Sequence, residues 1–184
     1  MRYDPSKHHR RSIRLKGYDY EKCGAYFITL CAWQRQKLFG EIENAEMRLN
    51  TYGEIIQLHW DNLPKHHHHL ELDEFTIMPN HVHGIIILTD KTTCEERHGL
   101  QEIIRGFKTF SARRINKIRR LSGVGVWQRG YYEHIIRNEK SLMAIREYIV
   151  KNPSSWGKDE LHCVHPREWD GQIKNLALQM NRIM

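Results

Sequence analysis

Apolar residues follow two different spacings along the chain, and each spacing predicts one kind of secondary structure. Residues 25–33 are rich in aromatic and β-branched residues, which is typical of a buried strand. Residues 52–63 carry their apolar side chains three and four positions apart, which predicts an amphipathic helix. Pro64 is expected to end that helix. The first part of the chain is therefore predicted to form a strand followed by a helix.

Two segments of strand length flank the dipeptide Pro79-Asn80 in the middle of the chain. Residues 72–78 and 82–88 both have the length of a strand, and the dipeptide between them is typical of a tight turn. We therefore expect an antiparallel hairpin at this point.

The second half of the chain predicts a helix, a strand and a further helix. Apolar residues at helical spacing cover residues 100–120, and residues 127–137 are typical of a strand with Gly130 as a bulge. A last helix begins near Asn138 or Ser141 and ends at Asn152, because a proline follows.

The predicted order of elements is strand, helix, strand, strand, helix, strand and a terminal helix. This order is the ferredoxin-like βαββαβ pattern of the α+β class, an antiparallel sheet covered by helices on one face. With 184 residues and 40% hydrophobic residues, one domain accounts for the chain. We expect an N-terminal arm over residues 1–18, the domain over residues 19–156, and a tail over residues 157–184.

Positive charge is concentrated in the arm and in the second half of the chain. The formal net charge is +7, and residues 103–132 contain no acid. Such an excess indicates a polyanionic partner, although charge runs are often only solvated surface. The basic residues that we expect to contact DNA phosphates are Arg10, Arg11, Arg14, Lys108, Arg113, Arg114, Lys117 and Arg129.

The cellular setting follows from what the sequence lacks. The longest apolar run has the length of a strand, and the first residues have no secretory signal. The four cysteines are scattered without metal-binding or disulfide spacing, which is typical of reduced thiols. We therefore expect a cytoplasmic protein with no membrane partner.

Histidines occur in two conspicuous patterns. His81 and His83 flank a valine in a predicted strand, so both side chains project from one face and can converge on a divalent ion. Gly84 is expected to leave room beside them for a bulky ligand. His-x-His in a strand is more often two partly exposed histidines, so spacing alone leaves both interpretations open. The run of histidines at 66–69 is expected to be an exposed loop that binds nickel adventitiously.

The terminal helix carries a candidate nucleophile. Tyr148 and Asn152 are four residues apart and therefore share one helical face. Asn152 could donate an oxygen to the metal while Tyr148 presents its phenol to a phosphate. By periodicity alone, Tyr148 is better explained as a core aromatic residue beside Ile145. Tyr131 and Tyr132 are rival nucleophiles that lack a partner at helical spacing, and we interpret them as structural or base-stacking residues.

These motifs together resemble a known family. The segment from Met78 to His83 resembles the HUH motif of single-tyrosine transposases, in which two histidines flank a hydrophobic residue. Four further segments resemble the REP-associated tyrosine transposases and extend the resemblance over most of the chain: Gly17-Tyr18-Asp19-Tyr20, Arg105-Gly106-Phe107-Lys108, residues 126–137, and residues 146–153.

The resemblance implies a mechanism. His81, His83 and Asn152 would bind Mg²⁺ or Mn²⁺, which would act as a Lewis acid on a phosphate of single-stranded or hairpin DNA. Tyr148 would attack that phosphate and form a 5′-phosphotyrosine link, so that strands can be cut and rejoined in DNA transposition without ATP. The family also implies a bacterial, nucleoid-associated protein that acts as a monomer or a homodimer.

Three alternatives remain open at the level of sequence. The first is a non-catalytic module that binds single-stranded nucleic acid with the same fold. The second is a metal-dependent nuclease that uses water as nucleophile and forms no protein–DNA adduct. The third is an inactive relative, against which the joint presence of His81, His83 and Tyr148 weighs.

Overall fold

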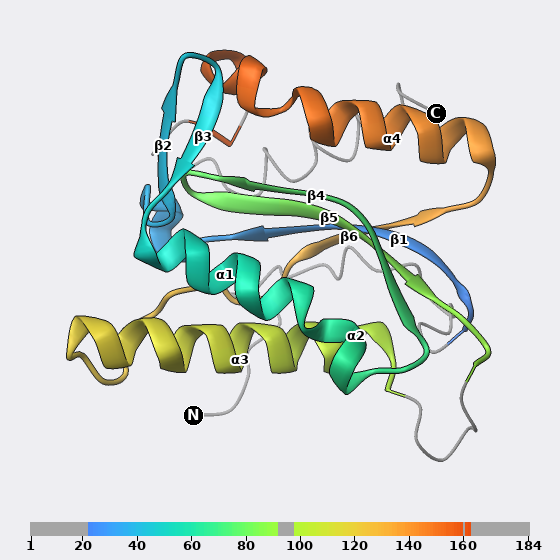
Figure 1. Ribbon diagram of the computed structural model, residues 1–184, viewed down its shortest axis with the longest axis horizontal. Helices are drawn as coiled ribbons and strands as arrows, with labels where there is room; N and C mark the ends of the chain where they lie inside the picture. The colour runs from blue at the N-terminus through green and yellow to red at the C-terminus, as the bar shows by residue number, and fades with distance from the viewer. Residues whose placement is uncertain (1–21, 92–97, 160, 163–184) are drawn as a thin grey trace, which may run out of the picture.

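A computed structural model describes residues 22–91, 98–159 and 161–162 of the chain (Figure 1). The elements, in chain order, are β1 (Gly24–Cys31), η1 (Trp33–Arg35), β2 (Gly40–Glu43), β3 (Glu46–Leu49), α1 (Thr51–Asp61), α2 (Leu63–His66), β4 (Leu70–Met78), β5 (His81–Leu88), α3 (Leu100–Arg119), β6 (Tyr132–Ile136), α4 (Glu139–Lys151) and η3 (Pro153–Lys158). The predicted arm, with Arg10, Arg11 and Arg14, and most of the predicted tail lie outside the described residues. No helix among the described residues is both long and apolar enough to span a membrane.

The main sheet confirms the ferredoxin-like prediction. Its four strands lie in the order β4-β5-β1-β6, and every neighbouring pair is antiparallel. Helices α1 and α3, which make the two crossovers, cover one face of the sheet, and α4 covers the other (Figure 1). The predicted hairpin is β4 and β5, joined at Pro79 and Asn80.

The alternation of side chains along the strands divides the interior into two cores. Tyr26, Ile28 and Leu30 of β1 point toward α1 and α3 and belong to the larger core. Phe27 of β1 points the other way, into a smaller core with Ile145 of α4. In β5, Val82 lies in the larger core, so the neighbouring residues His81 and His83 project on the α4 side.

Gly84 has a different role from the one that its sequence position suggested. A Cβ atom at this position would lie 2.6 Å from the Trp60 ring and 2.9 Å from Phe75. These aromatic residues stack on each other with ring centroids 4.2 Å apart. The prediction that Gly84 opens space beside the histidines is therefore wrong, because residue 84 faces the opposite side of the strand and admits Trp60 to the larger core.

Two predicted boundaries differ from the structure, and one small hairpin was not predicted. Pro64 lies in the first turn of α2, where its missing N–H costs nothing, so it continues the helical path after α1 instead of ending it. The fourth strand begins only at Tyr132, and Trp127 makes an isolated bridge with Ala32. The small hairpin of β2 and β3 was not predicted, because its four-residue strands are largely polar and offer no apolar run.

Candidate active site

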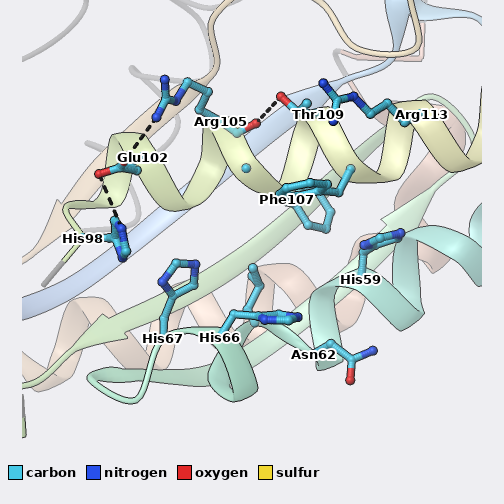
Figure 2. A pocket seen from close by; sticks show the side chains of 13 residues that line it. His59, Asn62, His66, His67, His98, Glu102, Arg105, Phe107, Thr109 and Arg113 are labelled. Carbon is cyan, nitrogen blue, oxygen red and sulfur yellow. Dashed lines mark hydrogen bonds and ion pairs between the residues drawn. The ribbon is translucent and has the colours of Figure 1, made fainter. Parts of the chain in front are cut away.

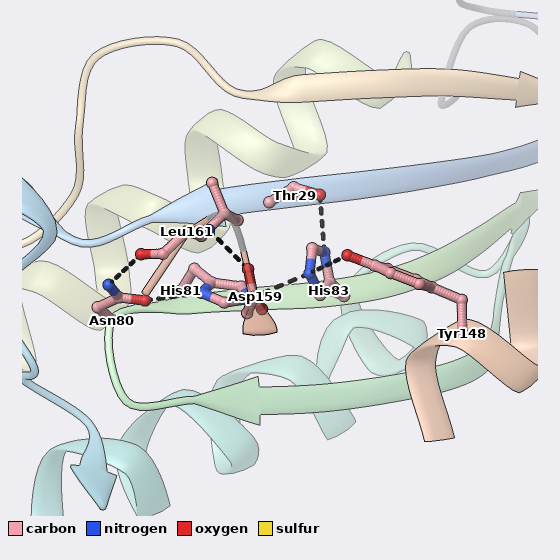
Figure 3. Close-up of polar contacts among 7 residues, drawn as sticks. All are labelled: Thr29, Asn80, His81, His83, Tyr148, Asp159 and Leu161. Atoms are coloured by element: carbon pink, nitrogen blue, oxygen red, sulfur yellow. Dashed lines mark hydrogen bonds and ion pairs between the residues drawn. The ribbon is translucent and has the colours of Figure 1, made fainter. Parts of the chain in front are cut away.

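The two histidines of the predicted metal site lie side by side at the start of β5. His81 and His83 are both fully buried, and their Nε2 atoms are 3.1 Å apart (Figure 3). Their rings meet nearly edge to face, with centroids 4.5 Å apart. The i, i+2 spacing on a strand thus brings two ring nitrogens to a common point, as the sequence predicted.

The outer ring nitrogen of each histidine is held by a polar side chain. Asn80 Oδ1 lies 2.7 Å from His81 Nδ1, and the Asn80 amide nitrogen donates to the Leu161 carbonyl, which fixes the orientation of the amide. Because the amide oxygen only accepts, His81 carries its proton on Nδ1 and presents a lone pair at Nε2. Asn80 is therefore the residue that selects the metal-binding tautomer of His81.

The partner of His83 permits either tautomer. Thr29 Oγ1 lies 2.8 Å from His83 Nδ1, and a hydroxyl both donates and accepts. In one arrangement, His83 donates from Nε2 to His81. In the other, both Nε2 atoms direct lone pairs to a shared point, which is the arrangement that metal ligands need.

Burial keeps both histidines neutral. Removal from water lowers the pKa of His83 to about 3. The pKa of His81 is also well below the ordinary value, first because of burial and then because of His83 and the charge of Arg35. Neutral imidazole is the form that binds metals, so the pair is ready for an ion at neutral pH.

Tyr148 reaches this pair from α4. Its hydroxyl lies 3.3 Å from His83 Nε2, and its ring packs edge to face against Phe27 and His83 (Figure 3). Residue 148 is only partly buried and lines a small open pocket with Asn152. The structure therefore brings the predicted nucleophile and the predicted metal ligands together.

Helix α4, which carries Tyr148, is fixed at its N-terminus and near its middle. The Asn138 side chain caps α4 by accepting from the Ser141 backbone, at 2.8 Å. Arg146 binds Asp73 of β4 through two parallel hydrogen bonds, Nε to Oδ1 at 2.8 Å and Nη2 to Oδ2 at 2.6 Å. Asp73 lies in an irregularity of β4 between Leu72 and Phe75, and this pair holds α4 against the sheet two residues from the phenol.

Two residues offer an oxygen as third ligand. Asp159 Oδ2 lies 3.6 Å from His81 Nε2, and ligand atoms of Asp159, His81 and His83 all lie within 4.8 Å of one another. Asn152, the predicted ligand, is buried, and its Oδ1 accepts no hydrogen bond within the described residues. The sequence analysis missed Asp159 because it follows η3, in a segment without periodicity, where only its carboxylate could have drawn attention.

The predicted DNA contacts fall into two groups. Arg113, Arg114 and Lys117 are exposed on α3, and Arg129 is exposed in the loop before β6. Lys108 instead donates to the carbonyls of Gln128 and Gly130, at 2.6 and 2.8 Å. Burial lowers its pKa to about 8, so Lys108 ties α3 to the loop before β6 and is a poorer candidate for a phosphate contact.

A second hollow lies on the opposite side of the sheet. A pocket of about 670 Å³ between α1, α2 and α3 is lined by His66, His67, His98, Arg105 and Arg113 (Figure 2). The prediction of an exposed loop at residues 66–69 is wrong in part, because His69 is buried and bonds the His98 carbonyl at 2.9 Å. Burial first, and then His98, His69 and His66, lower the pKa of His67 to about 4, so His67 is neutral at neutral pH.

Comparison with known proteins defines the class to which this fold and site belong. The model of the IS200-like transposase family matches residues 20–152, which include His81, His83, Tyr148 and Asn152. The chain belongs to this family of DNA transposases.

Individual relatives agree with that assignment. An uncharacterized protein of Haemophilus influenzae is 42% identical over 180 residues, covering 88% of this chain and 97% of the relative. A second protein of the same species, named provisionally as a REP-associated tyrosine transposase, is 26% identical and covers 83% of this chain and 91% of the relative. The solved structure of a REP-associated tyrosine transposase bound to a REP hairpin has the same fold, with a TM-score of 0.52 and 22% identity over 80% of this chain and 77% of that one.

Proposed function

We propose that this transposase cuts and rejoins single-stranded DNA through a covalent link to Tyr148. The observation that carries the proposal is the 3.3 Å approach of the Tyr148 hydroxyl to His83 Nε2, beside a second neutral histidine. A phenol held at this distance from two ligand nitrogens would contact the same phosphate as an ion bound to them.

The residues present fit a divalent metal ion. His81 and His83 supply two neutral nitrogens, and Asn152 or Asp159 supplies an oxygen. Nitrogen donors beside one oxygen suit Mn²⁺ better than Mg²⁺, which prefers oxygen ligands. When bound, such an ion supplies Lewis-acid polarisation of the scissile phosphate.

The chain's own residues position the nucleophile. The Tyr148 oxygen bonds to phosphorus as the phosphorus–O3′ bond breaks, so the 5′ side of the cut becomes a phosphotyrosine and the 3′ side leaves as a hydroxyl. The phenol releases one proton and the departing oxygen takes up one. Because the pKa of His83 is about 3, His83 is a weak proton acceptor and is better suited to bind the ion than to take up the phenol proton.

A single chain holds every part of this site. Tyr148 approaches the histidines of its own chain, since α4 packs on the sheet that contains them. The proposed chemistry therefore needs no second copy, although it does not exclude a homodimer. Action on DNA would place the protein at the bacterial nucleoid.

The DNA is proposed to extend beyond the site to basic residues. Arg113, Arg114 and Lys117 on α3 and Arg129 before β6 are exposed and have the charge that backbone phosphates require. Hairpin DNA is the natural test ligand, because the REP-associated relative of known structure is bound to a REP hairpin.

The test uses the full chain, a single-stranded hairpin oligonucleotide with a 3′ or 5′ extension, and Mn²⁺. The parent protein is expected to give a protein–DNA adduct that survives a denaturing gel. Tyr148→Phe should bind the DNA as well as the parent but form no adduct, because only the hydroxyl is lost.

Tyr132→Phe is the matched control. Tyr132 packs on the same core, and burial raises the pKa of its phenol to about 12, which makes it a poor nucleophile. An adduct that persists in Tyr148→Phe, or cleavage without any adduct, would overturn the proposal in favour of another tyrosine or a water nucleophile.

A further inference from the structure

The side chain of Arg35 is a charged group that is buried near the turn before His81. Arg35 is 4% exposed, and none of its three side-chain nitrogens has a hydrogen-bond partner among the described residues. An arginine is always charged, and its guanidinium carries five donors in a planar fork. Buried charges in proteins are almost always paired, so this arrangement needs an explanation.

The backbone holds Arg35 in place at some cost. Gln34 and Arg35 both have a φ of 52°, in the left-handed region that side chains other than glycine rarely adopt. Two consecutive residues of this kind are strained, and strain of this kind is concentrated at binding and catalytic sites. The neighbouring residues Trp33, Gln34, Gln36 and Lys37 are exposed, so Arg35 is a buried residue within a surface segment.

The segment around Arg35 is fastened to the turn that precedes His81. The Ala32 backbone donates to the Asn80 carbonyl at 2.8 Å, and the Phe39 backbone donates to the Pro79 carbonyl at 3.0 Å. Both ends of residues 32–39 therefore contact Pro79-Asn80. These contacts place Arg35 beside the turn that leads into His81.

We infer that Arg35 is the arginine of a phosphate subsite, which binds a backbone phosphate of the single-stranded DNA next to the scissile one. A phosphodiester presents two free oxygens, which match the two parallel donors of a guanidinium. The anion supplies the missing hydrogen-bond partners, and the strained backbone keeps the guanidinium oriented before the DNA arrives. The inference rests on the proposed action on DNA, but the binding that it describes requires neither Tyr148 nor a metal.

The test replaces Arg35 by methionine in the full chain that also carries Tyr148→Phe, with chelator present. Affinity for a single-stranded oligonucleotide is measured by fluorescence anisotropy at several salt concentrations. Arg35→Met should weaken binding by about tenfold or more, and it should reduce the log–log salt slope by about 0.7, the value for one phosphate contact. Arg48→Met, which removes an exposed arginine paired with Glu43, is the control and should leave the salt slope unchanged.

Thermal unfolding distinguishes a binding residue from a structural one. Without DNA, Arg35→Met should unfold at the same temperature as the parent or higher, because it removes a buried charge that has no partner among the described residues. A loss of stability with parent-like affinity and salt slope would overturn the inference. If Arg35→Met does not fold, the neutral variant Arg35→Gln serves instead, and parent-like affinity and salt slope in that variant would also overturn the inference.

Two further measurements distinguish a DNA phosphate from a free phosphate ion, and this inference from the proposed function. Inorganic phosphate should raise the unfolding temperature of the parent less than the oligonucleotide does. A phosphate effect that depends on Arg35, with oligonucleotide binding that does not, would assign the site to a free ion and overturn the DNA assignment. Absence of a covalent adduct in the otherwise unmodified parent contradicts the proposed function, whereas Arg35-dependent binding to the oligonucleotide would still support this subsite.

Discussion

At the scale of single residues, the site depends on which ring nitrogen carries each proton. Asn80 dictates the tautomer of His81, whereas Thr29 permits both tautomers of His83. In the absence of an ion, His83 can donate from Nε2 to His81, so metal binding requires its proton to move to Nδ1. The Thr29 hydroxyl is the acceptor that makes this rearrangement possible.

Thr29→Val should therefore weaken metal binding without displacing the histidines. The valine keeps the shape of the side chain and removes the acceptor, so Mn²⁺ affinity measured by calorimetry should fall by about tenfold to a hundredfold. Thr109→Val is the control, since Thr109 is exposed on α3 and bonds only the Arg105 carbonyl within the described residues. Equal Mn²⁺ affinity in Thr29→Val and the parent would show that the tautomer of His83 does not limit binding.

At the scale of elements, the position of α4 determines where the phenol lies. The paired hydrogen bonds between Arg146 and Asp73 join α4 to β4, and they hold the pKa of Asp73 below its ordinary value, chiefly through the bond from Arg146. This contact fixes the helix at a point two residues from Tyr148.

Arg146→Met should slow adduct formation by about tenfold or more, while DNA affinity changes little. A small misplacement of a reacting group can cost about a hundredfold in rate, whereas binding depends mainly on basic residues elsewhere. Single-turnover assays separate the two effects, and Arg146→Lys should be intermediate because it keeps one of the two bonds. Lys140→Met is the control on the same helix, since Lys140 is exposed in the first turn of α4, away from Tyr148. A parent-like rate in Arg146→Met would show that packing alone positions Tyr148.

The elements differ in how far sequence alone could predict them. The strands of the main sheet and the three long helices follow apolar spacing, so their order and the ferredoxin-like fold could be predicted. The hairpin of β2 and β3 could not, because its polar strands are defined by pairing with each other rather than by burial. Gly84 was misassigned because the alternation that places His81 and His83 on one face places residue 84 on the other.

The residues of the candidate active site also differ in how far sequence alone could predict them. His81, His83 and Tyr148 were predicted from spacing and from family resemblance, and the structure brings them together. Asp159 and Arg35 belong to short irregular segments, where no periodicity relates a residue to the site. Their proximity to His81 arises only from tertiary folding, which pattern analysis does not capture.

At the scale of the whole molecule, buried neutral histidines should make stability depend on pH. His67 on one side of the sheet and His83 on the other have pKa values of about 4 and about 3, below the ordinary 6.5 that they regain on unfolding. Between pH 6.5 and these lower pKa values, the unfolded chain therefore binds more protons than the folded chain. The stability of the folded state is therefore highest above pH 6.5, where both histidines are neutral whether the chain is folded or unfolded. It falls as the pH drops toward 4 and then 3.

Unfolding temperatures measured with chelator present should consequently fall from pH 6.5 downward. His67→Gln should flatten the upper part of this decline, between about 6.5 and 4, because it removes one of the groups that become protonated on unfolding. His68→Gln, which alters the exposed neighbour, should follow the parent. If both variants decline as the parent does, His67 does not contribute to the acid sensitivity.

The alternation of side chains in β5 also bears on how such a protein can diverge over time. Successive residues of this strand face α4 or the opposite helices in turn. Substitutions on the outer surface of α3 can therefore accumulate while the histidines on the other face of the sheet keep their places. A single-residue insertion in β5 is different, because it would exchange the two sides and turn the histidines away from Tyr148. Relatives of this transposase are thus expected to differ in sequence on the outer surface of α3 and to keep the same number of residues in β5.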